Sequence, residues 1–205
     1  MSRSALAVAG VLFLLYPVFR PWADETTTAG ALEAMGSSAW VVSHFFAMVG
    51  LVLVPLALLG LRHIVGIRPV AVMWVGAGLT LPYYGAEDFG LHAAATEGTN
   101  LLAVADAVRY NPVAITSFAV GLLTLAVGAV LVAVAVWRSA DVNKYGALAF
   151  AAGFVLFLPQ FFTPGPVRIA HGVLMLVGLV WLAIAAAPVN RPATTTQRLS
   201  SQSTT

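Results

Sequence analysis

The chain has 205 residues, of which 60% are apolar and only 9% are charged, and its mean hydropathy is +0.92. Soluble domains carry about 25% charged residues, so these charges are too few for a water-facing surface, and lipid is the expected solvent. The net charge of +2 gives no basis for nucleic-acid binding. The absence of cysteine excludes disulfides, zinc–thiolate sites, iron–sulfur clusters and thiol nucleophiles.

Six apolar segments predict an all-α polytopic membrane helix bundle. In chain order they are Ser4–Phe19, Ala39–Leu61, Pro69–Leu91, Pro112–Trp137, Tyr145–Phe162 and Val167–Ala187. A helix crosses the hydrocarbon with about 20 residues, and the two shorter segments end in aromatic residues suited to the interface. The first segment is followed by large residues rather than a small-residue cleavage site, so we expect it to be retained.

The connections and the ends of the chain complete this architecture. The segments Thr28–Met35 and Asn100–Val108 are expected to form short interfacial helices. Residues 1–189 are predicted to form a single transmembrane domain, and residues 190–205, rich in Thr, Ser and Gln, a disordered polar tail. Glycine pairs such as Gly121 with Gly128 and Gly146 with Gly153 are expected to permit close helix packing.

Three of the apolar segments end in proline followed by aromatic residues, and each is followed by a returning segment. These endings are Leu15–Phe19, Leu81–Tyr84 and Leu158–Phe162. The pattern predicts three consecutive helical hairpins in which Pro17, Pro82 and Pro159 lie at similar depth. Each proline frees a backbone carbonyl that needs another partner within a membrane.

The basic residues predict the orientation of the bundle. When the segments alternate in direction, seven basic residues fall on one side and three on the other, where most acidic residues also lie. Cytoplasmic connections carry the excess of Lys and Arg, so both termini are predicted to be cytoplasmic in a multi-pass protein of the cell membrane.

Polar side chains inside or near the segments gather at the predicted outer leaflet. Tyr84, Asp88 and His92 follow one another at four-residue spacing and share a helix face, as Arg168 and His171 do at three. Arg168 is the expected partner of Asp88 or Glu87, above a floor of aromatic residues that includes Phe45 and Phe161. The residues predicted to bind a ligand are His44, Tyr83, Tyr84, Asp88, His92, Arg168 and His171, and the candidate catalytic residues are Glu87, Asp88 and His92.

Several interpretations of this constellation stay open. It can form a pocket for a small lipophilic or lipid-like ligand, with a carboxyl group tuned as an acid or base. Two of His44, His92 and His171 can instead ligate a b-type haem. A metal site has no linear signature here. Alternatively, these groups only form interhelical hydrogen bonds and an ion pair in a structural or assembly subunit, so enzymatic activity is undecided.

Several stretches resemble a group of small multi-spanning membrane proteins from high-GC actinobacteria. They are Leu15-Tyr16-Pro17 with Arg20-Pro21, Pro82 through Glu87 with Gly90-Leu91-His92, Leu158 through Phe162, and Arg168 through Gly172. The resemblance implies architecture over nearly the whole chain and no activity. The run His171 through Met175 is also similar to haem-carrying helices of cytochrome b561-like proteins. Those proteins place histidine pairs in both leaflets, whereas the predicted cytoplasmic leaflet here has no intramembrane histidine.

Overall fold

The computed structural model describes residues 2–139 and 144–186, and in these residues the chain forms helices joined by turns, with no strand. The predicted tail from residue 190 lies outside the described residues. The longer helices are α1 (Ser2–Phe19), α3 (Ser38–Gly60), α5 (Ile67–Gly85), α8 (Pro112–Arg138), α9 (Lys144–Val155) and α10 (Gly165–Ala185). The shorter ones are α2 (Thr28–Met35), α4 (Arg62–Val65), α6 (Leu91–Thr96) and α7 (Leu101–Arg109), with the π-helix η1 (Ala86–Gly90) and the 3₁₀-helix η2 (Pro159–Phe162).

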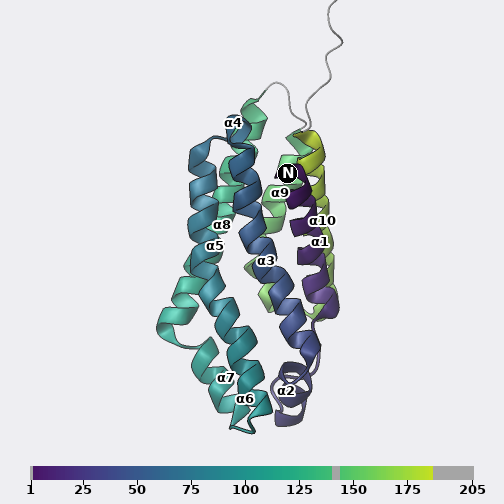
Figure 1. The fold of residues 1–205 in the computed structure, drawn as a ribbon, viewed down its shortest axis with the longest axis vertical. Coiled ribbons are helices and arrows are strands. Elements are labelled where there is room, and N and C mark those ends of the chain that lie inside the picture. The colour runs from purple at the N-terminus through teal and green to yellow at the C-terminus, as the bar shows by residue number, and fades with distance from the viewer. Residues whose placement is uncertain (1, 140–143, 187–205) are drawn as a thin grey trace, which may run out of the picture.

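The longer helices form a ring in the order of the chain. Among the described residues, α1, α3, α5, α8, α9 and α10 each pack against the next, and α10 packs back against α1. The start of α1 and the end of α10 lie with α4 at one end of the bundle, which we term the α4 end (Figure 1). Helices α2, α6 and α7 lie at the other end, which we term the α7 end.

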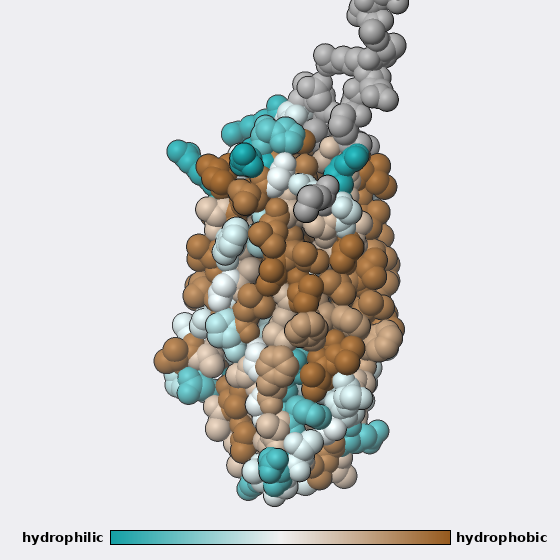
Figure 2. Space-filling view, in the orientation of Figure 1, coloured by the Kyte–Doolittle hydropathy of each residue, from teal (hydrophilic) through white to brown (hydrophobic). Residues whose placement is uncertain are grey.

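Four helices in the described residues are long and apolar enough to span a membrane, namely α1, α3, α8 and α10. Helix α9 is apolar but has only 12 residues. Helix α5 carries Arg68 near its start and Pro82 with two tyrosines near its end, which lower its mean hydropathy. Apolar side chains cover the middle of the face shown in Figure 2, with polar side chains gathered at both ends, as expected for a membrane protein.

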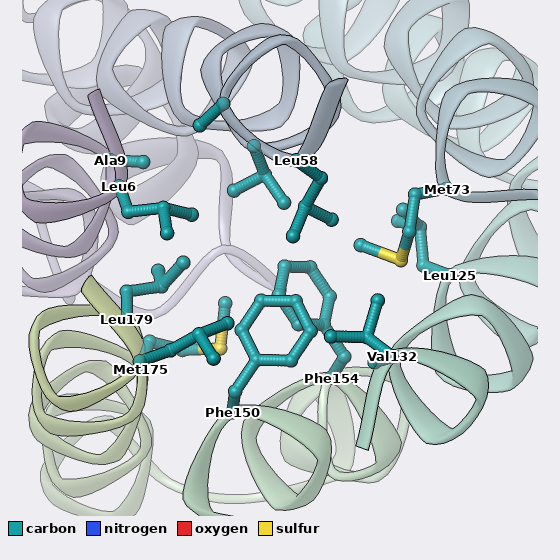
Figure 3. Packing of buried hydrophobic residues seen from close by; sticks show 14 of the residues in the cluster. Leu6, Ala9, Leu58, Met73, Leu125, Val132, Phe150, Phe154, Met175 and Leu179 are labelled. Atoms are coloured by element: carbon teal, nitrogen blue, oxygen red, sulfur yellow. The ribbon is translucent and has the colours of Figure 1, made fainter. Parts of the chain in front are cut away.

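The interior of the ring is filled by apolar side chains. Leu6, Leu58, Met73, Phe150 and Leu179 come from five different helices and point toward one another (Figure 3). Each of them is at most 1% exposed. In the described residues, the interior of the ring is therefore a packed apolar core along most of its length.

Glycine allows the closest helix contacts, as the sequence predicts. A Cβ at Gly121 would lie 2.5 Å from Thr80 Oγ1, and one at Gly128 would lie 2.7 Å from Met73 Sδ, so α5 and α8 meet at these positions. Gly146 and Gly153 likewise allow α9 to approach α10. Small residues let helices approach without a side chain between them, which favours packing in lipid.

The proline segments end their helices in different ways but at one level. The rings of Tyr16 and Tyr84 lie 6.0 Å apart, and Phe118 contacts both Tyr83 and Phe161. Tyr16, Tyr83 and Phe161 lie within two residues of the three prolines, so the prolines lie near one level of the bundle. The expected single helix over 145–162 is wrong in detail, because α9 ends at Val155 and Pro159 begins η2. Proline has no backbone N–H and favours the first turn of a new helix.

Candidate functional site

A cavity of about 510 Å³ opens at the α7 end of the bundle. Such a volume lies within the range of small-molecule sites. Helices α1, α3, α5, α7, α8 and α10 contribute to its wall, as do η1, η2 and the α1–α2, α7–α8 and α9–η2 connections. Its lining residues are Tyr16, Arg20, Glu25, His44, Tyr83, Tyr84, Glu87, Arg109, Tyr110, Ile115, Phe118, Ala119, Leu158, Phe161, Phe162 and Arg168.

Aromatic rings make most of the apolar wall. Tyr83 stacks on Phe118 with ring centroids 4.2 Å apart, and Phe118 meets Phe161 edge-on at 5.4 Å. These contacts join α5, α8 and η2 across the cavity. Aromatic pairs in these geometries add about 0.5–1.5 kcal/mol beyond their burial, so this wall is firmly packed.

A chain of ion pairs forms the polar side. Arg20 Nη2 donates to Glu25 Oε1 at 2.6 Å, and Arg109 Nη2 donates to Glu25 Oε2 at 2.7 Å. Arg109 also donates through Nε and Nη2 to the Glu87 carboxylate, with Nε at 3.0 Å from Oε1. The α1–α2 connection, η1 and α7 are thereby held together by four alternating charges.

These ion pairs set the charge states of Glu25 and Arg109. Burial raises the pKa of Glu25, but the nearby Arg20 and Arg109 lower it more, so the pKa lies below its usual value. Burial lowers the pKa of Arg109, but hydrogen bonds and charge from Glu87 and Glu25 raise it above its usual value. Both groups are therefore charged at neutral pH.

Arg168 has a different environment. Its Nε donates to Thr163 O at 2.9 Å and its Nη2 to Phe161 O at 2.6 Å, so it binds the free carbonyls at the end of η2. Its guanidinium carbon lies 5.3 Å from the centroid of the Trp22 ring, and that of Arg20 lies 4.8 Å from the same ring. Among the described residues, no carboxylate lies within 4.0 Å of Arg168.

The structure brings together part of the predicted site. His44, Tyr83, Tyr84 and Arg168 line the cavity, and so does the candidate catalytic residue Glu87. Asp88, His92 and His171 do not line it. The prediction that Arg168 neutralises Asp88 or Glu87 is wrong, because Arg109 pairs with Glu87 and neither Asp88 oxygen has a partner among the described residues. Phe45, predicted to line the floor, is 52% exposed on the outer surface of α3.

His44 is the buried histidine of the cavity wall, with 2% of its surface exposed. Its Nδ1–H donates to Trp40 O at 2.8 Å, which leaves Nε2 as the acceptor of a neutral ring. The centroid of the His44 ring lies 4.3 Å from that of Trp40 and 5.2 Å from that of Tyr16. This surrounding holds the imidazole in one orientation within the wall.

Asp88 is fully buried beside the cavity, and neither carboxylate oxygen has a hydrogen-bond partner among the described residues. It lies in η1, where the helix makes one π-turn. An ionised carboxylate without a partner would lose its hydration at a large cost. Glu87, its neighbour on the same turn, points instead into the cavity and pairs with Arg109.

His92 and His171 are each tied to a carbonyl elsewhere. His92 Nδ1–H donates to Met35 O at 2.7 Å, and His171 Nε2–H donates to Gly153 O at 2.8 Å. His171 lines a second, very small cavity of about 10 Å³, and His92 lines neither. Neither of these two cavities is lined by two of the three histidines, and each ring donates to a different carbonyl, so this donor set does not fit a bis-histidine haem. No group of three metal-ligating side chains occurs in residues 2–139 and 144–186.

The sequence analysis did not find Glu25, Tyr16 or Phe118 as parts of the site. Glu25 could have been found as a glutamate only five residues after Arg20 in the chain. Phe118 gave no signal, because one phenylalanine in an apolar helix can face either lipid or the core. Comparisons with family models, with curated proteins and with solved structures gave no match for this chain, so the assignment of function depends on this geometry alone.

Proposed function

We propose that the chain is a six-span protein of the cell membrane, built from three hairpins, with the α7 end outside and both termini in the cytoplasm. The four long apolar helices support membrane insertion. Every described Asp and Glu lies at the α7 end, in α2, η1, α7 or the connections beside them. The α4 end carries Arg62, Arg68, Arg138 and Lys144, and an excess of basic residues is typical of the cytoplasmic side.

The absence of cysteine makes this topology directly testable. A cysteine introduced at Asp106 should react with a membrane-impermeant maleimide in intact cells. A cysteine at Arg62 or Lys144 should react only after the membrane is opened. Labelling of the Arg62 variant from outside intact cells would contradict the proposed orientation.

We propose further that the cavity binds a small lipophilic or lipid-like molecule from the outer leaflet. The observation that carries this proposal is the joining of an aromatic wall to a chain of charges around one cavity of about 510 Å³. Sites for small molecules combine apolar walls with a few placed polar groups. Tyr110 is 69% exposed and Phe162 is 85% exposed, so the cavity opens beside them, at the outer surface of the bundle.

The geometry favours binding over catalysis by the predicted acids. Glu87 is engaged by Arg109, and Asp88 is separated from the cavity. Among the cavity residues, His44 keeps one ring nitrogen free as an acceptor. That nitrogen can accept a hydrogen bond from a bound molecule.

Filling the cavity tests the proposal. Ala119 lines the cavity, whereas its neighbour Val120 is 46% exposed on the outer face of α8 and does not. The variant Ala119→Trp should lose molecules that co-purify with the wild-type protein, as measured by mass spectrometry of extracts. The matched variant Val120→Trp should retain them. Equal amounts of bound lipophile in both variants would contradict binding in this cavity.

A structural role is the second candidate, and the ion-pair chain is the observation that favours it. Arg109 joins Glu25 to Glu87 and so fixes three separate elements at the α7 end. A protein that only assembles with others needs no ligand. Purification in mild detergent would then give a stable hetero-complex, and neither tryptophan variant would change its bound lipids.

A further inference from the structure

We propose that the ligand of this cavity is a membrane lipid with a phosphodiester headgroup, bound by Arg168 with Arg20 beside it. This inference rests on the proposed binding function and specifies its ligand. The phosphate oxygens would accept hydrogen bonds from Arg168. The acyl chains would lie along the aromatic wall and leave the cavity near Phe162.

The first argument is the balance of charge. Three arginines and two glutamates line the cavity, so its lining has a surplus of one positive charge. Both glutamates are engaged by Arg20 and Arg109, and Arg168 has no carboxylate within 4.0 Å in the described part of the chain. A partly buried cation in an apolar bundle needs an anion to offset its lost hydration. One phosphodiester supplies the single negative charge that balances the lining.

The second argument is the orientation of Arg168. Two of its five N–H donors bind the carbonyls of Thr163 and Phe161, and its other donors have no acceptor among the described residues. The two bonds fix the plane of the guanidinium while leaving donors for a ligand. A planar guanidinium held in this way suits two oxygens of one phosphate.

The third argument is the second cation. Arg20 and Arg168 both lie against the Trp22 ring, so their guanidinium carbons are at most about 10 Å apart. The Trp22 ring is itself held by a hydrogen bond from Nε1 to Pro17 O at 3.0 Å. Arg20 Nε is buried without an acceptor, so Glu25 does not use the full donor capacity of Arg20. Two cations on one fixed ring create a positive region at the polar end of the cavity.

The fourth argument is the apolar remainder of the cavity. Leu158, Phe161 and Ile115 line the same cavity as Arg168, and so does Phe162, which is 85% exposed. A free phosphate ion would leave this surface without a partner. A lipid uses both parts, since its headgroup meets the arginines and its chains meet the rings.

The test compares two lipids that differ only in the headgroup. The purified protein in detergent is titrated with phosphatidylglycerol and with diacylglycerol of the same chains, and binding is measured by native mass spectrometry. The wild-type protein should prefer phosphatidylglycerol. Arg168→Gln can still donate to a carbonyl but has no charge, and should reduce this preference about tenfold or more. The control Arg62→Gln, at the α4 end, should leave it unchanged.

The outcomes separate the two proposals. Equal binding of both lipids, unaffected by Arg168→Gln but lost in Ala119→Trp, would overturn the headgroup inference and leave the cavity function standing. No binding of either lipid would contradict both. Inorganic phosphate that competes as strongly as phosphatidylglycerol would keep the anion site and overturn a lipid as its source. If Arg168→Gln fails to fold, Arg168→Lys keeps the charge without the planar donors and should show a smaller preference than wild type.

Discussion

Replacement of Arg109 by methionine should destabilise the α7 end strongly, because this side chain alone joins Glu25 to Glu87. The exposed fractions of Arg109, Glu25 and Glu87 are 22%, 17% and 12%. Removal of one partner from a fully buried ion pair costs about 3–5 kcal/mol, and exposed pairs contribute about 0–1 kcal/mol. For these partly buried groups we expect a loss of about 2–3 kcal/mol for Arg109→Met.

The measurement is thermal unfolding in detergent, followed by intrinsic tryptophan fluorescence, to which Trp22 and Trp40 near Arg20 contribute. Arg62→Met at the α4 end is the control, since Arg62 is exposed and, among the described residues, donates to Leu59 O alone. The double variant Glu87→Gln with Arg109→Met should be less destabilised than Arg109→Met alone. Such a rescue would identify the unpaired carboxylate as the source of the loss.

The pH dependence of unfolding provides an independent check that the ion pairs of Glu25 stabilise the fold. The pKa of Glu25 is lowered from 4.5 in the folded protein, although burial alone would raise it, because Arg20 and Arg109 favour its charged form. The stability from this group is therefore complete above about pH 4.5 and is lost as the pH falls through the lower, folded-state pKa. Arg109→Met removes one of the two cations, so its difference from wild type should shrink below pH 4.5. A variant that unfolds like wild type at pH 7 would refute this reasoning.

Two further substitutions test the packing. At Gly76 an added Cβ would lie 2.7 Å from Leu125 N, so Gly76→Ala should lower the free energy of unfolding by about 1–3 kcal/mol. At Gly78 an added Cβ would meet no atom within 4 Å, so Gly78→Ala should be neutral or stabilising by up to about 1 kcal/mol. The two variants are compared by their unfolding curves, and an equal loss of stability in both would argue against the close α5–α8 contact. Asp88→Asn should leave the melting temperature unchanged or raise it, because neither Asp88 oxygen has a described partner. A fall of several degrees would show that this carboxyl group has a stabilising partner.

The positions of residues along the helices could be predicted from the sequence. The segment 28–35 was predicted as a short helix and is α2, and the three proline–aromatic endings meet at one level. These features depend on the position of a residue along its helix axis, which follows from the number of residues to the helix end at a rise of about 1.5 Å per residue. Proline, aromatic and basic residues gather near the helix ends, so the position of a residue along the helix axis can be predicted from the sequence.

The direction in which a side chain points around its helix was much harder to predict. In a soluble protein, polar residues mark the outer face, but here both the lipid-facing and the inward faces are apolar. Phe45 was therefore assigned to the site although it faces outward, and Phe118 was not assigned although it lies in the wall. Arg168 and Arg109 lie at the same level, and only their directions decide which one meets Glu87.

The π-turn explains another part of the difference. Tyr84, Asp88 and His92 were predicted to share one face, which holds only for an uninterrupted α-helix. The turn Ala86–Gly90 inserts about one residue, equivalent to a rotation of about 100°, between the faces before and after it. Tyr84 therefore lines the cavity while His92 meets Met35 O of α2. No residue pattern in this segment marks a π-turn.

The closed ring of helices has a consequence for the order of assembly. Five of its interfaces join long helices that follow one another in the chain, and these can form while the chain is being synthesised. The sixth joins α1 to α10, where a Cβ at Gly172 would lie 2.9 Å from Pro17 Cγ. The face of α1 that packs against α10 can therefore be covered only after the last helix has formed. Because Tyr16 and Arg168 come from these two helices, the cavity is completed in the same step that closes the ring.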